Sequence, residues 1–86
     1  MKHKVYTVYD SKLKTYAHPF QSLNKGHAMR YVDDWLKNPE HPFSKYAADF
    51  TLFEIGEYDD ELGHYQMHEA KEPMGCLLEF KTEKGN

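Results

Sequence analysis

The chain opens with lysines and tyrosines in one stretch, KHKVYTVYD, followed by a lysine-rich turn. If residues 4–9 form a strand, Lys2, Lys4 and Tyr6 share one face, because side chains alternate along a strand. Lysines beside exposed rings are typical of single-stranded nucleic acid binding, in which charge holds phosphates and rings stack on bases. The candidate residues are Lys2, Lys4, Tyr6, Lys12, Lys14, Lys25 and Arg30. In the alternative interpretation, Tyr6 covers the core and the lysines keep an edge strand soluble.

A run of acidic residues farther along could hold a metal ion or supply paired catalytic carboxylates; it comprises Glu54, Glu57, Asp59, Asp60 and Glu61. Its spacing does not match a calcium loop, which places oxygen ligands at alternate positions around a central glycine. On a hairpin these acids should diverge over both faces and the turn, so we predict no metal site. The same segment could instead dock on a partner protein. The candidate interface residues are Phe53, Ile55, Glu57, Asp59 and Asp60.

Histidine and nucleophile patterns give no catalytic prediction. His64 and His68 are four residues apart, which on a strand separates them by about 13 Å, too far to share one ion. The sequence has no G-x-S-x-G motif and no phosphate-binding glycine loop. The single cysteine, Cys76, lies in an apolar run without a basic neighbour, as expected for a small buried thiol. We therefore predict a protein that is not an enzyme and uses no cofactor.

Charge is distributed unevenly over the 86 residues, although the net charge is only −3. The first thirty residues carry six basic side chains against one acid, a net of +5, and the remainder carries five lysines against thirteen acids, a net of −8. Such polarity can pair two copies head to tail. A chain this short also has a thin core that a second subunit would extend. We predict a homodimer, and no membrane partner because no segment approaches the roughly 20 apolar residues of a span.

Two eight-residue segments, YDSKLKTY from Tyr9 and YDDELGHY from Tyr58, share tyrosine, aspartate, leucine and tyrosine at equivalent places. Each predicts a β-hairpin with a four-residue loop in which the aspartate accepts backbone N–H bonds. The predicted register places Tyr9 opposite Tyr16 and Tyr58 opposite Tyr65. We interpret the two segments as one turn design used twice.

The remaining pattern predicts one main helix between the hairpins, from a cap at Asn24 to Lys37, ended by Asn38-Pro39. A further helical turn is expected within 44–50. In the strand TLFEIGEY, Leu52 should face the helix while Phe53 and Ile55 face a second covering layer. CLLEF, residues 76–80, predicts a last strand.

The predicted fold is therefore α+β: an antiparallel sheet of four to five strands, made of two β-hairpins plus a C-terminal strand, with one main helix packed on a face. It forms a single domain over residues 1–82, followed by a frayed tail over 83–86.

The segments KVYTVYDSKLKTYAHPF, FTLFEIGEYDDELGHYQMH and GCLLEF resemble the small nonstructural protein of gokushoviruses, tailless single-stranded DNA phages of the microvirus group. The resemblance implies a phage accessory protein made in the host bacterial cytoplasm and absent from the mature virion. It implies a role in the switch from double-stranded replicative DNA to viral single-strand synthesis and packaging. It implies no catalytic residues.

Two functional hypotheses follow. In the first, the protein acts in that switch by binding single-stranded DNA through its basic hairpin. In the second, it binds no DNA and docks on the phage replication initiator, a host replication protein or the procapsid. A metal-dependent nuclease that uses the acidic turn is a third alternative.

Overall fold

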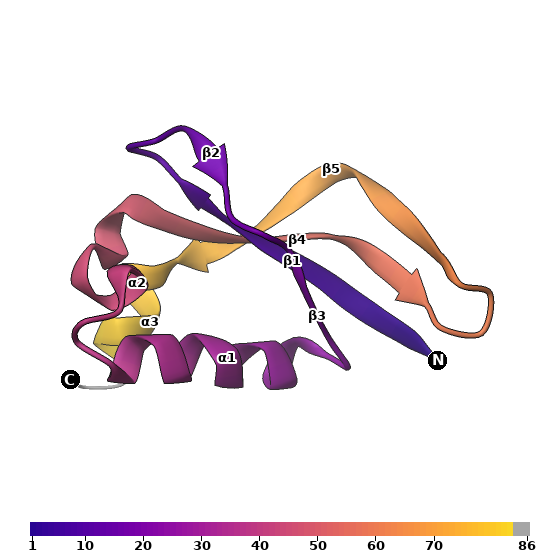
Figure 1. The fold of residues 1–86 in the computed structure, drawn as a ribbon, viewed down its shortest axis with the longest axis horizontal. Helices are drawn as coiled ribbons and strands as arrows, with labels where there is room; N and C mark the ends of the chain where they lie inside the picture. Colours follow the sequence, from indigo (N-terminus) through magenta and orange to yellow (C-terminus); the bar gives the residue numbers. More distant parts are fainter. Residues whose placement is uncertain (84–86) are drawn as a thin grey trace.

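Strand β1 (Lys2–Asp10) lies inside a five-stranded antiparallel sheet in the computed structural model, which describes residues 1–83 (Figure 1). β2 (Thr15–Tyr16) and β3 (Phe20–Ser22) pair with β1, whereas β4 (Phe50–Asp59) pairs with both β1 and the edge strand β5 (His64–Cys76). The helical elements are α1 (Lys25–Lys37), α2 (Pro42–Lys45), the 3-10 turn η1 (Ala47–Asp49) and α3 (Leu77–Glu83). The predicted α+β class is confirmed. No helix in this part of the chain is long and apolar enough to cross a membrane.

Both predicted hairpins form in the predicted register. Tyr9 lies opposite Tyr16, and Tyr58 lies opposite Tyr65. In the first turn, Asp10 Oδ1 accepts the N–H groups of Lys12 at 2.9 Å and Leu13 at 3.2 Å. In the second, Asp59 Oδ1 accepts those of Glu61 at 2.9 Å and Leu62 at 3.1 Å. The aspartates therefore close the two turns in the same way.

The last loop position is left-handed in both turns, with φ of 56° at Lys14 and 69° at Gly63. Glycine adopts this conformation without steric cost, whereas a lysine does not. The first turn therefore carries backbone strain that the second avoids.

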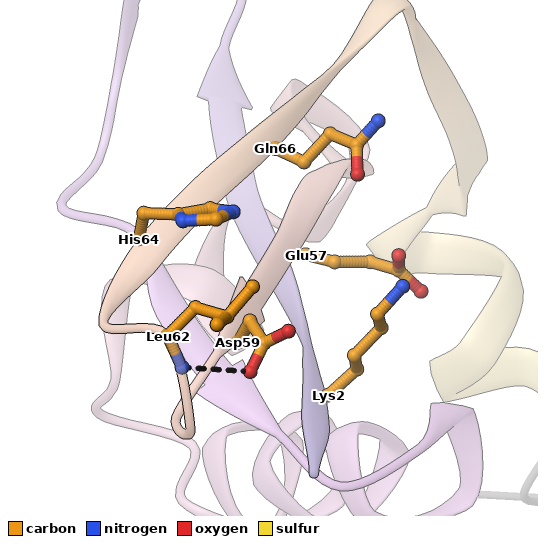
Figure 2. Close-up of a pocket in the computed structure, with 6 residues that line it drawn as sticks. All are labelled: Lys2, Glu57, Asp59, Leu62, His64 and Gln66. Atoms are coloured by element: carbon orange, nitrogen blue, oxygen red, sulfur yellow. Dashed lines mark hydrogen bonds between the residues drawn. The ribbon is translucent and has the colours of Figure 1, made fainter.

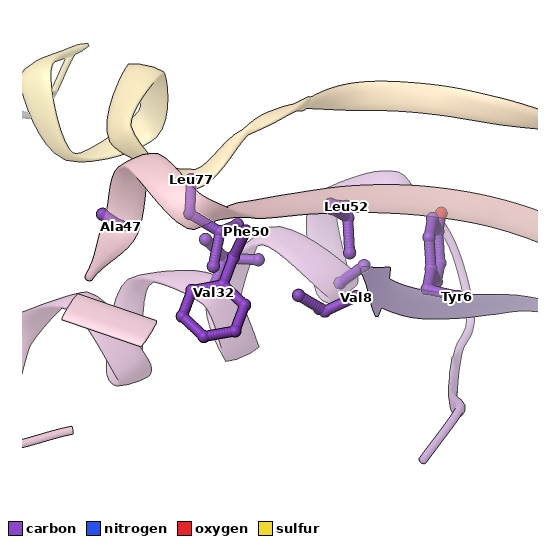
Figure 3. Packing of buried hydrophobic residues seen from close by; sticks show 8 residues of the cluster. Tyr6, Val8, Val32, Ala47, Phe50, Leu52 and Leu77 are labelled. Carbon is purple, nitrogen blue, oxygen red and sulfur yellow. The ribbon is translucent and has the colours of Figure 1, made fainter. Parts of the chain in front are cut away.

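Helix α1 begins and ends where the sequence predicts. Asn24 Oδ1 accepts the His27 N–H at 2.9 Å, and Asn38 is the C-terminal cap before Pro39. Its buried residues, Ala28 and Val32, pack on the sheet. Figure 3 shows the resulting core, in which Tyr6, Val8, Val32, Ala47, Phe50, Leu52 and Leu77 meet between the sheet and the helices.

The predicted strand over residues 76–80 is wrong. β5 ends at Cys76, which pairs with Thr51 close to the beginning of β4, so the chain beyond it has no strand to pair with. It turns into α3, whose backbone hydrogen bonds are internal, and Leu77 is fully buried. Cys76 is only half-buried. The helix also includes Glu83, the first residue of the predicted tail, and residues 84–86 lie outside the described chain.

An irregular pairing separates the two ends of β4 and β5. Glu54 pairs with Glu72 and Gly56 with Met67, so residues 68–71 of β5 face the single residue Ile55. A Cβ atom on Gly56 would lie 2.7 Å from the Gln66 carbonyl oxygen and 2.9 Å from the Met67 Cα. Only glycine permits this close approach of the two strands.

We predict that Lys14→Gly stabilises the protein by about 0.5–1 kcal/mol, because it removes a left-handed lysine. Gly63→Ala should destabilise it by about 1 kcal/mol, although the added Cβ meets no atom within 4 Å. Urea unfolding measures both changes, with Lys12→Gly in the same turn as control. Equal effects of the two lysine substitutions would show that the strain at Lys14 is absent.

We also predict an acid-dependent contribution from the second turn. The backbone N–H groups of Leu62 and Glu61 lower the pKa of Asp59 below its ordinary 3.8. A lowered folded-state pKa gives stability that is present above 3.8 and is lost as pH falls through the folded value. The stability difference between wild type and Asp59→Asn should therefore shrink below about pH 4. Asp34→Asn, on the exposed side of α1, controls for the loss of one charge; an acid-independent difference would contradict the prediction.

Candidate nucleic-acid interface

The two faces of the sheet differ in what covers them. Val8 and Leu52 pair on the face that packs against the helices, whereas Thr7 and Phe53, one residue along each strand, pair on the other. Figure 1 shows the helices within residues 1–83 on the first side of the sheet and none of them on the second. We call this second side the open face; its side chains are Val5, Thr7, Tyr9, Tyr16, Phe53, Ile55, Tyr58, Tyr65 and Met67. The second layer predicted over Phe53 and Ile55 is thus not supplied by residues 1–83.

Aromatic rings gather at both ends of the open face. The ring centroids of Tyr9 and Tyr16 lie 4.7 Å apart, and Phe53 lies edge-on to Tyr16 at 6.1 Å. At the other end, the rings of Tyr58 and Tyr65 are 4.9 Å apart. Tyr16 is 44% exposed and Tyr65 is 54% exposed, so both rings are accessible to a planar ligand.

Two adjoining hollows lie between these aromatic pairs. One, of about 330 Å³, is lined by Val5, Pro19, Gln21, Ile55, Tyr65 and Met67. The other, of about 350 Å³, is lined by Thr7, Tyr16, Ala17, Pro19, Ile55 and Lys71. Because Pro19 and Ile55 line both, the hollows form one groove across the open face. Of these lining residues, only Lys71 is charged.

Polar groups at the two ends of the groove could orient a ligand. The Lys71 ammonium group lies 5.4 Å from the centroid of the Tyr16 ring. The Gln21 side-chain amide donates a hydrogen bond to the Tyr65 hydroxyl at 2.9 Å. The arrangement combines ring faces for stacking, one cation and an amide donor.

Carboxylates of the central strands point away from this groove. Glu54 and Glu57 pair with Tyr6 and Lys4, on the helix side of the sheet. Glu54 is buried, and its Oε2 lies 2.7 Å from His68 Nε2 and 3.8 Å from Lys4 Nζ. The negative charge of β4 thus lies on the helix side, where Lys4 offsets part of it.

Tyr6 does not have the role that the basic-hairpin hypothesis gave it. It shares the helix-side face with Lys2 and Lys4, as predicted, but its ring is fully buried in the core. Burial raises the pKa of its hydroxyl, and the nearby Glu54 raises it further. The expectation of an exposed, stacking Tyr6 is wrong, and the alternative that Tyr6 covers the core is confirmed.

The predicted basic residues do not form one surface. Lys4 Nζ lies 3.4 Å from Glu57, so its charge is already compensated, and Lys2 lies on the same side of the sheet. Lys25 and Arg30 belong to α1, in the opposite layer from the open face. Lys12 and Lys14 remain exposed in the β1–β2 turn, next to the Tyr9 and Tyr16 pair.

The predicted partner interface is divided in the same way. Phe53 and Ile55 lie on the open face, Glu57 and Asp59 point to the helix side, and Asp60 lies in the β4–β5 turn. The apolar and acidic parts of that set therefore cannot contact one flat partner surface together.

A small polar hollow of about 100 Å³ lies on the helix side near the second turn (Figure 2). Its lining residues are Lys2, Glu57, Asp59, Leu62, His64 and Gln66. Figure 2 shows the Lys2 amine beside the Glu57 carboxylate and Asp59 bonded to the Leu62 N–H. Asp59 is thus engaged by the turn, Glu57 is paired with Lys4, and the lining residues include no candidate nucleophile.

The acidic turn is more convergent than predicted. Carboxylate oxygens of Asp59, Asp60 and Glu61 all lie within 4.8 Å of one another, so the expected divergence fails for these three. The Met1 amine donates to Asp60 at 2.7 Å and to Glu61 at 2.9 Å, and His3 Nε2 lies 2.9 Å from Asp60. The amine and His3 lower the pKa of Asp60, and the two carboxylates raise the pKa of the amine. A cation is thus already supplied by the chain itself.

Sequence reasoning missed Tyr16, Tyr65, Gln21 and Lys71 as site residues. The two tyrosine pairs were predicted, but their face was not assigned. Counting from Leu52, which is core, places Phe53 on the opposite face, and the pairing of Phe53 with Thr7 places Tyr9 and Tyr16 there too. The same alternation would place Tyr58 on the Leu52 face; the bulge at Ile55 between β1 and β4 brings Tyr58 and Tyr65 to the open face instead. Lys71 had no such signal, because its position depends on the irregular segment 68–71.

The family model described as Phage ORF5 protein matches residues 3–80, nearly the whole chain. No curated protein and no solved structure is significantly similar to it. The chain therefore belongs to the phage ORF5 protein family.

Proposed function

We propose that this ORF5-family protein is a non-enzymatic accessory protein of a single-stranded DNA phage, acting in the switch to viral single-strand synthesis and packaging. It works by binding single-stranded DNA on the open face. The gokushovirus resemblance supports the role, a site of action in the host cytoplasm and absence from the virion. The open face is the surface on which we propose that the DNA binds.

The observation that carries the proposal is an uncovered aromatic groove free of carboxylates among its lining residues. Every base has a π-face, so exposed rings such as Tyr16 and Tyr65 bind a single strand with little sequence preference. Duplex DNA keeps its bases stacked internally and cannot use these rings. Selectivity for single strands follows.

The charge around the groove permits binding of single-stranded DNA, although the net charge of the chain is acidic. Glu54 is paired with His68 and Lys4 on the helix side. Lys12, Lys14 and Lys71 lie in the first turn and along the groove. A strand that runs along the groove toward the first turn meets cations, because the acidic turn is at the other end of the sheet.

The apolar character of the groove favours a second candidate function. Val5, Pro19, Ile55 and Met67 line one hollow and would equally suit an apolar side chain of a phage replication initiator, a host replication protein or the procapsid. Such docking would depend less on salt than DNA binding does.

We predict that Tyr16→Ala combined with Tyr65→Ala weakens binding of a labelled single-stranded oligonucleotide at least about tenfold, since each stacked base contributes roughly 1–3 kcal/mol. Fluorescence anisotropy at two salt concentrations, with duplex as competitor, measures this. Tyr46→Ala is the matched control, because Tyr46 is equally exposed at 54% but lies in the link after α2.

Unchanged affinity in the double variant would remove the open face as the DNA site. A wild-type protein that binds no oligonucleotide at low salt would remove DNA binding and leave the protein-docking function.

We predict further that Lys12→Gln with Lys14→Gln reduces the salt dependence of binding. If each lysine contacts one phosphate, the slope of log affinity against log salt should fall by about 1.4 for a single strand. Lys25→Gln with Arg30→Gln, on α1, removes the same charge and should leave the slope unchanged. Equal effects of the two pairs would point to general electrostatics rather than to this surface.

A further inference from the structure

Opposite charges lie at the two ends of the open face. The first turn carries Lys12 and Lys14 beside one tyrosine pair. The second carries Asp59, Asp60 and Glu61 beside the other pair, and it stays net acidic because the Met1 amine offsets only one of the three carboxylates. Figure 1 shows the two turns at opposite ends of the sheet. The longest extent of the molecule is 40 Å. Because charges in salt are screened within about 10 Å, the two ends cannot neutralise each other within one chain.

The face between the charged turns is nearly the same when read from either end. From each turn one meets a tyrosine pair, then one hollow of the groove, then Ile55 and Pro19, which both hollows share. In a two-fold dimer the same patch of both copies meets, so each end of this face would lie over the opposite end of the partner's face.

We infer that a second copy of this chain covers the open face, related by a two-fold axis near Ile55. Each basic turn then lies over the acidic turn of the partner, and each Tyr9–Tyr16 pair lies over the partner's Tyr58–Tyr65 pair. The contact between basic and acidic turns is thus formed twice, once at each end of the dimer, and the apolar groove is removed from water.

Features of β5 disfavour the other simple dimer, in which edge strands pair. Pro73 has no N–H to donate, and the irregular segment 68–71 interrupts regular pairing. A stable interface needs about 800 Å² per partner. The molecule is only 40 Å long and 18 Å across its shortest direction. An interface of that area therefore needs the whole length of a face.

Charge exchange between the turns tests this arrangement. Lys12→Glu with Lys14→Glu makes both turns acidic, and Asp60→Lys with Glu61→Lys makes both basic. Sedimentation velocity should give a dimer for wild type and at least about tenfold weaker association for each double variant alone. The mixture of the two should form a heterodimer, and the quadruple variant should dimerise again. This recovery separates repulsion from misfolding.

Asp34→Lys with Glu40→Lys is the control, because it changes the net charge as much as the basic double variant does but lies on and after α1. It should leave the dimer intact. A wild-type chain that is monomeric up to millimolar concentration would overturn the inference. So would a dimer that neither the mixture nor the quadruple variant restores, or one that the helix-side control also disrupts.

The same experiment distinguishes this inference from DNA binding, since a second copy and a DNA strand would occupy the same face. A charge-dependent dimer without affinity for the oligonucleotide keeps the inference and overturns the proposed function. A monomer that binds the oligonucleotide keeps the proposed function and overturns the inference.

Discussion

The pairing of β1 with β4 determines what the rest of the molecule can do. It places Val8 beside Leu52 and Tyr6 beside Glu54 on one face, where α1 and α3 bury them. The same alternation places Thr7 and Phe53 on the other face, which no described helix covers. A shift of one residue between these strands would exchange the core for the open face. The register is therefore fixed by burial, and the open face is a consequence of it.

A small domain with one uncovered aromatic face is expected to use that face. The carboxylates of β4 lie on the helix side, so the open face differs from the whole chain in both polarity and charge. A DNA strand or a second copy would each bury the same rings, and each would use the charged turns. If the proposed function holds, competition between them would couple the oligomeric state to the amount of single-stranded DNA present.

Local chemistry made much of the fold predictable. The aspartate in each hairpin turn, the cap at Asn24 and the stop at Asn38-Pro39 all act within a few residues, so their signals can be read directly. The C-terminal element could not be predicted in this way, because CLLEF is apolar enough for either a strand or a helix. Whether this segment forms a strand or a helix depends on the length of β4, the strand with which it would have to pair. The candidate site was predicted in part: Lys12, Lys14, Phe53 and Ile55 lie where such a surface needs them, whereas Tyr6 depended on knowing which face the helix covers.

On the proposed function, the open face, and not the helix side, contacts single-stranded DNA. Two-dimensional NMR of the labelled protein during titration with an oligonucleotide tests it directly, because each amide and tyrosine ring reports separately. We expect chemical-shift changes that concentrate on the Tyr9–Tyr16 and Tyr58–Tyr65 pairs and on Lys71, with the amides of α1 unmoved. Shifts that concentrate on α1 around Lys25 and Arg30, with the tyrosine pairs unmoved, would contradict it.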